Sequence, residues 1–292
     1  MSRKILILAL ISLLPSALQG SGSRTIDFTG EAGLPVNAAG PVLVMMDAER
    51  GRLIAANTIT SSLTVIDCAD GTVRNIPVGG RAYQHLKSES MTSRKSTGQV
   101  YLIGVGCFYV IDPAAETSLT VRTGAQLESV AVDEETGNVF LAGRESPDLF
   151  FYDAAEDKLT RLGWLKTSEP LVNLNATPPP PLRKVVSDPG LGRIIAVDGY
   201  TSTLWLFDSA TGKPDRHRPV PVASGGRWHL GGYDMADHRL YIVTETAGRE
   251  VKEAAMIDVA GSDDLVAALP GYREGVGIIY NPARREIYIP YD

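Results

Sequence analysis

Short apolar segments that end in aspartate recur along the chain. They are LTVID (63–67), FYVID (108–112), LFFYD (149–153), LWLFD (204–208) and AAMID (254–258). Alternating apolar, β-branched and aromatic residues bounded by Gly, Asp and Pro turns predict β-strands. No window has the apolar spacing of an amphipathic helix, so we expect an all-β protein.

A regular spacing links these segments to the strands that precede them. Companion runs such as RLIAAN (52–57) and NVFLAG (138–143) precede them, and most of these runs follow a further strand that ends in Asp or Asn. Twenty residues separate Asp47 from Asp67, Asp133 from Asp153 and Asp188 from Asp208, and 24 separate Asp234 from Asp258. A four-stranded unit of about 40 to 45 residues is typical of a propeller blade. We therefore predict a β-propeller of four-stranded antiparallel blades, with five complete blades plus half of a sixth.

The last blade is expected to be incomplete. Its first strand ends at Asn281, so the same spacing would place its later aspartate near about position 301, past Asp292. An open sheet edge invites aggregation, and residues 24–29 could supply one closing strand. Two alternatives stay open: a fragment of a longer protein, which the spacing favours, or a ring that closes irregularly.

The N-terminus has the pattern of a secretory signal. Arg3 and Lys4 precede an apolar run at 5–14, and Pro15 and small residues follow to Gly20. The run is too short to span a bilayer, and no later segment predicts a membrane span. We expect a signal peptide at 1–20, an N-terminal extension at 21–41, a propeller at 42–292, and a periplasmic or extracellular location.

The overall charge narrows the choice of partner. The chain has 28 Lys and Arg against 34 Asp and Glu, a net charge of −6, and removal of Arg3 and Lys4 would leave −8. An acidic chain is a poor match for nucleic acid or an anionic membrane surface. We therefore expect a protein partner or a small polar ligand.

The two cysteines, Cys68 and Cys107, should not form a disulfide. Cys68 directly follows Asp67, whereas Cys107 stands five residues before Asp112, so they fall at opposite ends of equivalent strands in neighbouring blades. That offset is roughly 20 Å along a strand, and a disulfide needs Cα atoms within about 7 Å. Two free thiols are predicted.

The aspartates that end the third strands have a structural explanation. Asp accepts hydrogen bonds from the backbone two residues on and so stabilises tight turns. We assign this turn role to Asp67, Asp112, Asp153, Asp208 and Asp258.

The residues of the first blade resemble a known family. RLIAANTITSSLTVIDCADGTVRNIPVGG (52–80) is similar to one blade of the YVTN-type propellers, which include YncE-like exported proteins. In this chain the signature tetrapeptide reads Ile54-Ala55-Ala56-Asn57, and the resemblance covers about residues 42–292. It implies an exported propeller and assigns no chemistry, because these motifs shape strands and turns.

A ligand site is expected at the mouth of the central channel. Two insertions, at 166–181 and 244–252, fall on the same face, and such insertions often mark the binding face of a repeat protein. Alignment of the first strands by their terminal Asp or Asn puts Val42, Glu128, Arg183, His229 and Val276 in register. The expected ligand-binding residues are Glu128, Arg183, Arg227, Trp228, His229, Arg273, Glu274 and His85.

Catalytic motifs are missing from the sequence. It has no Cys-x-x-Cys-His, Gly-x-Ser-x-Gly or phosphate-binding loop, so we expect a binding scaffold with no cofactor, no bound metal and no autonomous catalysis. Two alternatives stay open. Residues 225–243 resemble a blade of amine dehydrogenase heavy chains, which implies the large subunit of a periplasmic oxidoreductase that docks a quinone-bearing light chain. A metal-dependent lactonase-type hydrolase would need further ligands beside Glu128.

Overall fold

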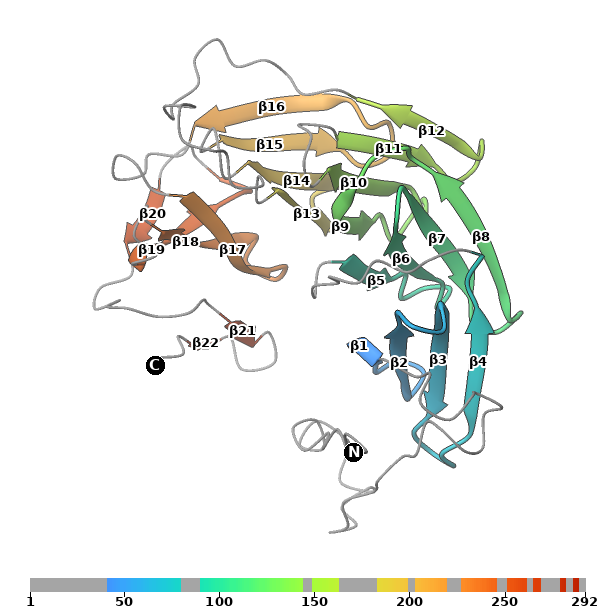
Figure 1. Ribbon diagram of the computed structural model, residues 1–292. Coiled ribbons are helices and arrows are strands. Elements are labelled where there is room, and N and C mark those ends of the chain that lie inside the picture. The colour runs from blue at the N-terminus through green and yellow to red at the C-terminus, as the bar shows by residue number, and fades with distance from the viewer. Residues whose placement is uncertain are drawn as a thin grey trace.

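The computed structural model describes residues 41–79, 90–143, 149–162, 183–198, 203–219, 227–245, 251–261, 265–268, 279–281 and 286–288. These residues form five four-stranded antiparallel sheets and one two-stranded sheet, and each sheet keeps its strands in chain order. In Figure 1 the sheets radiate as blades from a common centre. The predicted all-β propeller, with five complete blades and half of a sixth, is confirmed.

The strands of each blade follow one another through hairpins. Blade 1 holds β1 (Pro41–Asp47), β2 (Arg52–Asn57), β3 (Ser62–Asp67) and β4 (Val73–Pro77). Blade 2 holds β5 (Met91–Ser93), β6 (Val100–Gly104), β7 (Cys107–Asp112) and β8 (Thr117–Arg122). Blade 3 holds β9 (Leu127–Val132), β10 (Val139–Gly143), β11 (Leu149–Asp153) and β12 (Lys158–Arg161). The first strands lie innermost in Figure 1, and β4, β8 and β12 lie on the rim.

The remaining blades repeat the pattern. Blade 4 holds β13 (Arg183–Asp188), β14 (Arg193–Asp198), β15 (Thr203–Asp208) and β16 (Pro214–Pro219). Blade 5 holds β17 (Arg227–Asp234), β18 (Arg239–Glu245), β19 (Val251–Asp258) and β20 (Leu265–Ala268). The half blade pairs β21 (Ile279–Asn281) with β22 (Glu286–Tyr288). The expected signal peptide and closing strand lie outside the described residues.

The hydrophobic core lies between blades, because each central strand is buried on both faces. Along β6, Val100 and Leu102 pack with blade 1, whereas Tyr101 and Ile103 pack with blade 3. Successive side chains of a strand point to opposite faces, so one strand serves two interfaces. This is why the central strands appear in the sequence as continuous apolar runs.

The insertion expected as a loop at 244–252 is partly strand, which corrects the sequence prediction. Thr244 pairs with Glu253 and Glu245 pairs with Val251, so β18 and β19 are lengthened and only 246–250 stay outside the described residues. Extra residues in a hairpin cost less free energy when their backbone groups extend the ladder of hydrogen bonds, because those groups then have partners.

The thiol prediction is confirmed. Cys107 begins β7 and is buried, Cys68 follows the end of β3, and both are free. Among the described residues, no helix is long and apolar enough to cross a membrane.

Candidate functional site

The connections between strands divide the propeller into two faces. We call the face with the connections between second and third and between fourth and first strands the mouth face; in blades 1 and 2 it includes residues 58–61, 105–106 and 123–126. The opposite, turn face has the short connections between first and second strands, at 48–51, 94–99, 133–138, 189–192 and 235–238. The predicted ligand site belongs to the mouth face.

Glu128 lies at a β-bulge near the start of β9. Leu127 is opposite Gly143 and Ser129 is opposite Ala142, so Glu128 is the extra residue of the pair. Val42 is the extra residue of β1 in the same way, which confirms that these two positions are in register. A bulge re-aims the side chain that it carries, and bulges are frequent beside binding sites. The Glu128 side chain is nevertheless 6% exposed, so it is not openly presented to solvent.

Hydrogen bonds connect neighbouring inner strands around Glu128. The Ser90 hydroxyl donates to the Glu128 carbonyl oxygen over 3.3 Å, and the Val185 N–H donates to Ser129 Oγ over 3.0 Å. Blades 2, 3 and 4 therefore meet at this level. Arg183 opens β13, five residues before Asp188, as the sequence alignment placed it.

The structure positions only part of the predicted ligand set. Arg227, Trp228 and His229 open β17, and their backbones belong to the inner strand of blade 5. The side chains of Arg183 and of these three residues lie outside the described part of the structure, as do His85, Arg273, Glu274 and the insertion at 166–181. Their convergence on Glu128 stays a prediction.

Two exposed apolar side chains stand on the mouth face, and sequence reasoning missed them. Ile59 is 66% exposed and Val105 is 55% exposed, each in the connection between the second and third strands of its blade. The two turns end alike: Val78 N–H donates to the Ser61 carbonyl and Thr123 N–H to the Gly106 carbonyl, both over 2.9 Å. The equivalent turns of adjacent blades thus each present an apolar side chain, Ile59 as the second of four residues and Val105 as the first of two. Ile59, set among Thr and Ser in a predicted turn, was detectable from the sequence, whereas Val105 was hidden in an apolar run.

The turn face is held by aspartate-capped turns. The five third-strand aspartates accept hydrogen bonds from backbone N–H groups two or three residues on, as predicted: Asp67 from Ala69, Asp112 from Ala114, Asp153 from Ala155, Asp208 from Thr211 and Asp258 from Ala260. Their distances of 2.8 to 3.0 Å are those of ordinary hydrogen bonds. These carboxylates are explained by structure.

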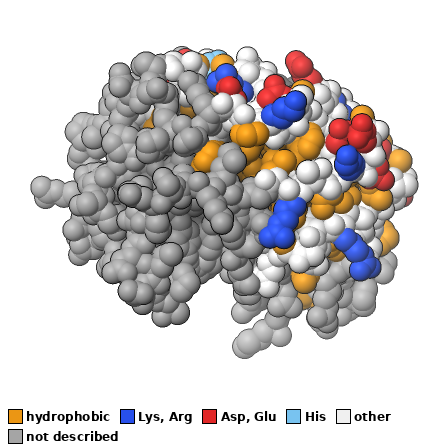
Figure 2. All heavy atoms as spheres, turned by 90° about the horizontal axis from the view of Figure 1, so that it is seen from above, with side chains coloured by type: hydrophobic (Ala, Val, Ile, Leu, Met, Phe, Trp, Pro, Cys, Tyr) orange, Lys and Arg blue, Asp and Glu red, His pale blue; other side chains and the backbone are white. Residues whose placement is uncertain are grey.

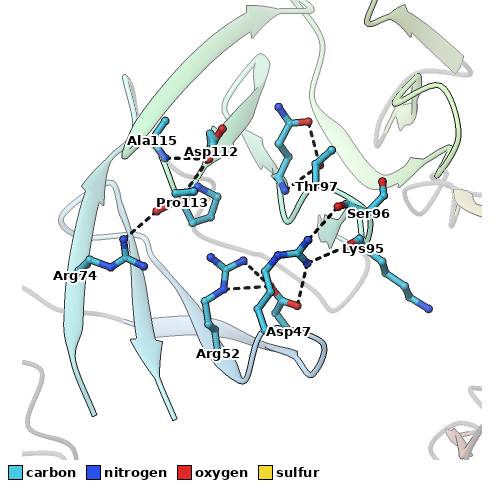
Figure 3. Close-up of polar contacts among 12 residues, drawn as sticks. Asp47, Arg52, Arg74, Lys95, Ser96, Thr97, Asp112, Pro113 and Ala115 are labelled. Atoms are coloured by element: carbon cyan, nitrogen blue, oxygen red, sulfur yellow. Dashed lines mark hydrogen bonds and ion pairs between the residues drawn. The ribbon is translucent and has the colours of Figure 1, made fainter. Parts of the chain in front are cut away.

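Arginines connect the turns of the first three blades. Arg50 donates to the Lys95 carbonyl over 2.8 Å and to the Ser96 carbonyl over 3.1 Å, which joins blade 1 to blade 2. Figure 3 shows these carbonyls beside the ion pair of Asp47 with Arg52, whose closest atoms are 2.5 Å apart.

A second arginine makes the same kind of contact one blade on. Arg94 donates to the Glu134 carbonyl over 3.0 Å and to the Glu135 carbonyl over 2.5 Å, which joins blade 2 to blade 3. In return, the Glu134 carboxylate accepts from the Lys95 N–H over 3.0 Å. We call the interface between two adjacent blades a seam. On the turn face, the seams between blades 1 and 2 and between blades 2 and 3 are both joined by guanidinium groups, which are charged at any physiological pH.

A buried carboxylate joins blade 4 to blade 5. Asp188 is 0% exposed, and its Oδ2 accepts from the Tyr233 hydroxyl and lies 2.7 Å from His238 Nδ1. Its Oδ1 accepts from the Leu191 N–H over 3.1 Å. Burial, followed by the hydrogen bond to Asp188, raises the pKa of Tyr233 well above its usual range, so this hydroxyl stays a donor. His238 lies in a turn between first and second strands, away from the mouth, as predicted, and His217 lies in the outer strand β16.

Charged and metal-binding side chains form no second site within the described residues. On the described part of the face in Figure 2, acidic and basic side chains are interspersed around a band of apolar ones. Among the described residues, no group of three or more His, Cys, Asp or Glu side chains is placed to hold a metal ion.

The comparisons with known proteins give the fold. No protein-family model and no curated protein sequence matches the chain. A structure of hydrazine synthase from Kuenenia stuttgartiensis superposes with a TM-score of 0.58 and 14% identity, over 90% of this chain and 77% of that one. A chain of a mitotic checkpoint complex superposes with a TM-score of 0.55 and 12% identity, over 92% of this chain and 82% of that one. At such identities the likeness shows the architecture alone, and it agrees with the blades described above: the chain has a β-propeller fold.

Proposed function

We propose that this chain is an exported β-propeller scaffold of the YVTN type that binds a protein partner through its mouth face and performs no catalysis by itself. The observation that carries the proposal is the pair of exposed apolar side chains, Ile59 and Val105, in the equivalent turns of adjacent blades. Each leaves a large apolar side chain in water where a turn would ordinarily be polar.

The contrast between the two faces supports this choice. Turns of the opposite face contact their neighbours through Arg50, Arg94 and Asp188, so their polar groups are largely used within the propeller. Exposed apolar groups on a rigid surface are suited to the desolvated centre of an interface, and polar residues such as Thr58 and Thr60 would form its rim.

Export is the second part of the proposal. Residues 1–20 would be removed as a signal peptide, residues 21–41 would form an extension, and the propeller would begin at about residue 42. The protein would then act in the periplasm or outside the cell. Fractionation of the source cells, followed by N-terminal sequencing of the mature chain, tests this part separately.

A capture experiment with paired variants tests the partner site. The tagged full chain is purified from the exported fraction of its own host, beside an Ile59→Asp/Val105→Asp double variant and a Met235→Asp control. Met235 is 48% exposed but lies on the turn face. We expect one co-purifying protein to be lost with the double variant and kept with the control. Loss with both variants, or with neither, contradicts the proposal.

A small polar ligand at the channel mouth is the second candidate. The bulge that sets Glu128 apart in β9 favours it, because the bulge changes the direction of an acidic side chain near the inner end of a blade. Native mass spectrometry would show a bound small molecule in the wild-type protein that disappears in Glu128→Gln. No described residue adds support for the amine dehydrogenase-type or lactonase-type alternatives.

A further inference from the structure

Acidic side chains are divided unevenly between the two faces of blades 1, 2 and 3. The described residues of these blades include 13 Asp and Glu, and 12 of them lie in turn-face connections or at the strand ends that lead into those connections. The exception, Glu128, lies near the mouth and is 6% exposed. The mouth-face connections outside the described residues, 80–89, 144–148 and 163–182, add four acidic and four basic residues in sequence. The described carboxylates of these blades are therefore concentrated on the turn face.

Arg122 stands at the mouth end of blade 2. It is the last residue of β8 and lies opposite Cys107, whose strand β7 begins directly after the turn that presents Val105. The Gly106 carbonyl of that turn accepts from the N–H of Thr123, the next residue along, over 2.9 Å. The Arg122 side chain is exposed and makes no hydrogen bond or ion pair with the described residues. Its charge is therefore available at the mouth face, beside Val105.

The direction of the Arg122 side chain follows from the contacts of β8 with blade 1. Ser118 Oγ donates to the Pro77 carbonyl over 3.0 Å, and a Cβ atom on Gly79 would lie 2.9 Å from Thr120 Oγ1. Alternate side chains of a strand point to the same side, so Arg122 shares the side of Ser118 and Thr120. Arg122 therefore points toward blade 1, the blade that carries the other apolar turn.

These features are complementary to a partner segment that is both apolar and acidic. Two apolar side chains and one guanidinium on neighbouring blades form a surface with an apolar centre and a charged edge, as in protein–protein interfaces. Arg can bind a carboxylate through two parallel hydrogen bonds, which fixes the direction of the approaching group as well as its distance. A basic segment would find no exposed carboxylate on the described mouth face of these blades, because Glu128 is buried.

We propose that the mouth face recognises an acidic protein segment, whose apolar side chains cover Ile59 and Val105 and whose carboxylate pairs with Arg122. This inference rests on the proposed function and adds the chemistry of the partner. The pair with Arg122 lies at the solvent-exposed edge, so it changes the affinity by a small factor and acts mainly on the choice of partner and the rate of association. The turn face, where the carboxylates are concentrated, repels the same segment.

Selection of random peptides displayed on phage, with the full chain as bait, tests this partner chemistry. We expect the selected peptides to combine Asp or Glu with large apolar residues. In fluorescence anisotropy, synthetic copies should bind Arg122→Gln roughly threefold and Arg122→Glu roughly tenfold more weakly than the wild-type chain. Added NaCl should weaken binding to the wild-type chain more than binding to Arg122→Gln. Lys158→Glu, the same charge reversal at the turn-face end of β12, should bind as the wild type does.

The outcomes separate this inference from the proposed function. Selected peptides that lose binding in Ile59→Asp/Val105→Asp but are not acidic, or that bind Arg122→Glu as tightly as the wild type, overturn the acidic partner and leave the mouth face as the binding surface. A selection that yields no peptide dependent on Ile59 and Val105 contradicts both. Equal losses in Arg122→Glu and Lys158→Glu also overturn the inference, because the effect would then come from net charge alone. Thermal unfolding of each variant shows that its fold is kept.

Discussion

The seam between blades 2 and 3 and the seam between blades 4 and 5 use the same turn in opposite ways. Arg94 and Asp188 hold equivalent positions, at the point where a first strand meets its connection to the second strand. Arg94 donates across its seam to two backbone carbonyls, whereas Asp188 accepts across its seam from a tyrosine and a histidine. The same structural position can therefore hold the neighbouring blade either as a hydrogen-bond donor or as an acceptor, provided that the facing turn supplies the complementary groups.

The two seams differ in which polar groups lose a hydrogen-bond partner when one side chain is removed. Removal of Arg94 leaves carbonyl groups near the surface, which water can reach. Removal of the Asp188 carboxylate takes the acceptor from the Tyr233 and His238 side chains at a position that is 0% exposed, whereas the Leu191 N–H keeps the carbonyl of residue 188. A buried polar group without a partner costs more than a bond lost at the surface. The stability of the seam between blades 4 and 5 should therefore depend more strongly on Asp188 than the stability of the seam between blades 2 and 3 depends on Arg94.

The largest effect is expected for Asp188→Ala. It should lower the free energy of unfolding by about 3 kcal/mol, because the Tyr233 and His238 donors lose a buried acceptor. Urea unfolding of the full chain measures the change. Asp208→Ala, at an exposed cap in the same blade, is the matched control and should cost about 1 kcal/mol. Equal losses for the two variants would contradict the comparison.

A smaller effect is expected for Arg94→Ala, about 1.5 to 2 kcal/mol, since two hydrogen bonds from a charged donor are lost. Arg94→Asp should not recover stability, although it restores the residue type of the other blades, because the Glu134 and Glu135 carbonyls need a donor. Arg74→Ala, which removes an exposed pair at the rim, should cost less than about 1 kcal/mol. Wild-type stability in Arg94→Asp would show that the seam between blades 2 and 3 does not need a hydrogen-bond donor at this position.

The smallest effect concerns pH and Asp133, which holds the same position in blade 3. Burial raises the pKa of Asp133, but hydrogen bonds from Thr136, Ser209 and the Glu135 backbone outweigh it and hold the pKa below its usual value. A lowered pKa in the folded state stabilises the protein above the unfolded value of about 3.9, and this contribution is lost as the pH falls further. Asp133→Asn should flatten the fall in stability below about pH 4, because the variant has no carboxylate to protonate at this position. Acid titrations with the same slope in both proteins would refute this assignment.

Much of the architecture could be predicted from local pattern. The 20-residue spacing gave five complete blades, the aspartates cap their turns, and the offset of Cys68 from Cys107 gave two free thiols. These features depend on residues close in sequence or on the repeat itself. The candidate site was less accessible, since Glu128 was placed in register but neither its bulge nor its burial followed from the alternation of β9.

The sequence by itself determined the strands, the turns and the number of blades, because hydrogen bonds within a hairpin and the two-residue period of a strand are local properties. Only the tertiary structure decided which polar groups meet across seams and which apolar side chains stay in water. Arg94 and Glu134 are 40 residues apart, and Asp188 and His238 are 50 apart. Their contact depends on the rotation of one blade against the next. That rotation arises from packing in the core between blades, which no short stretch of sequence contains.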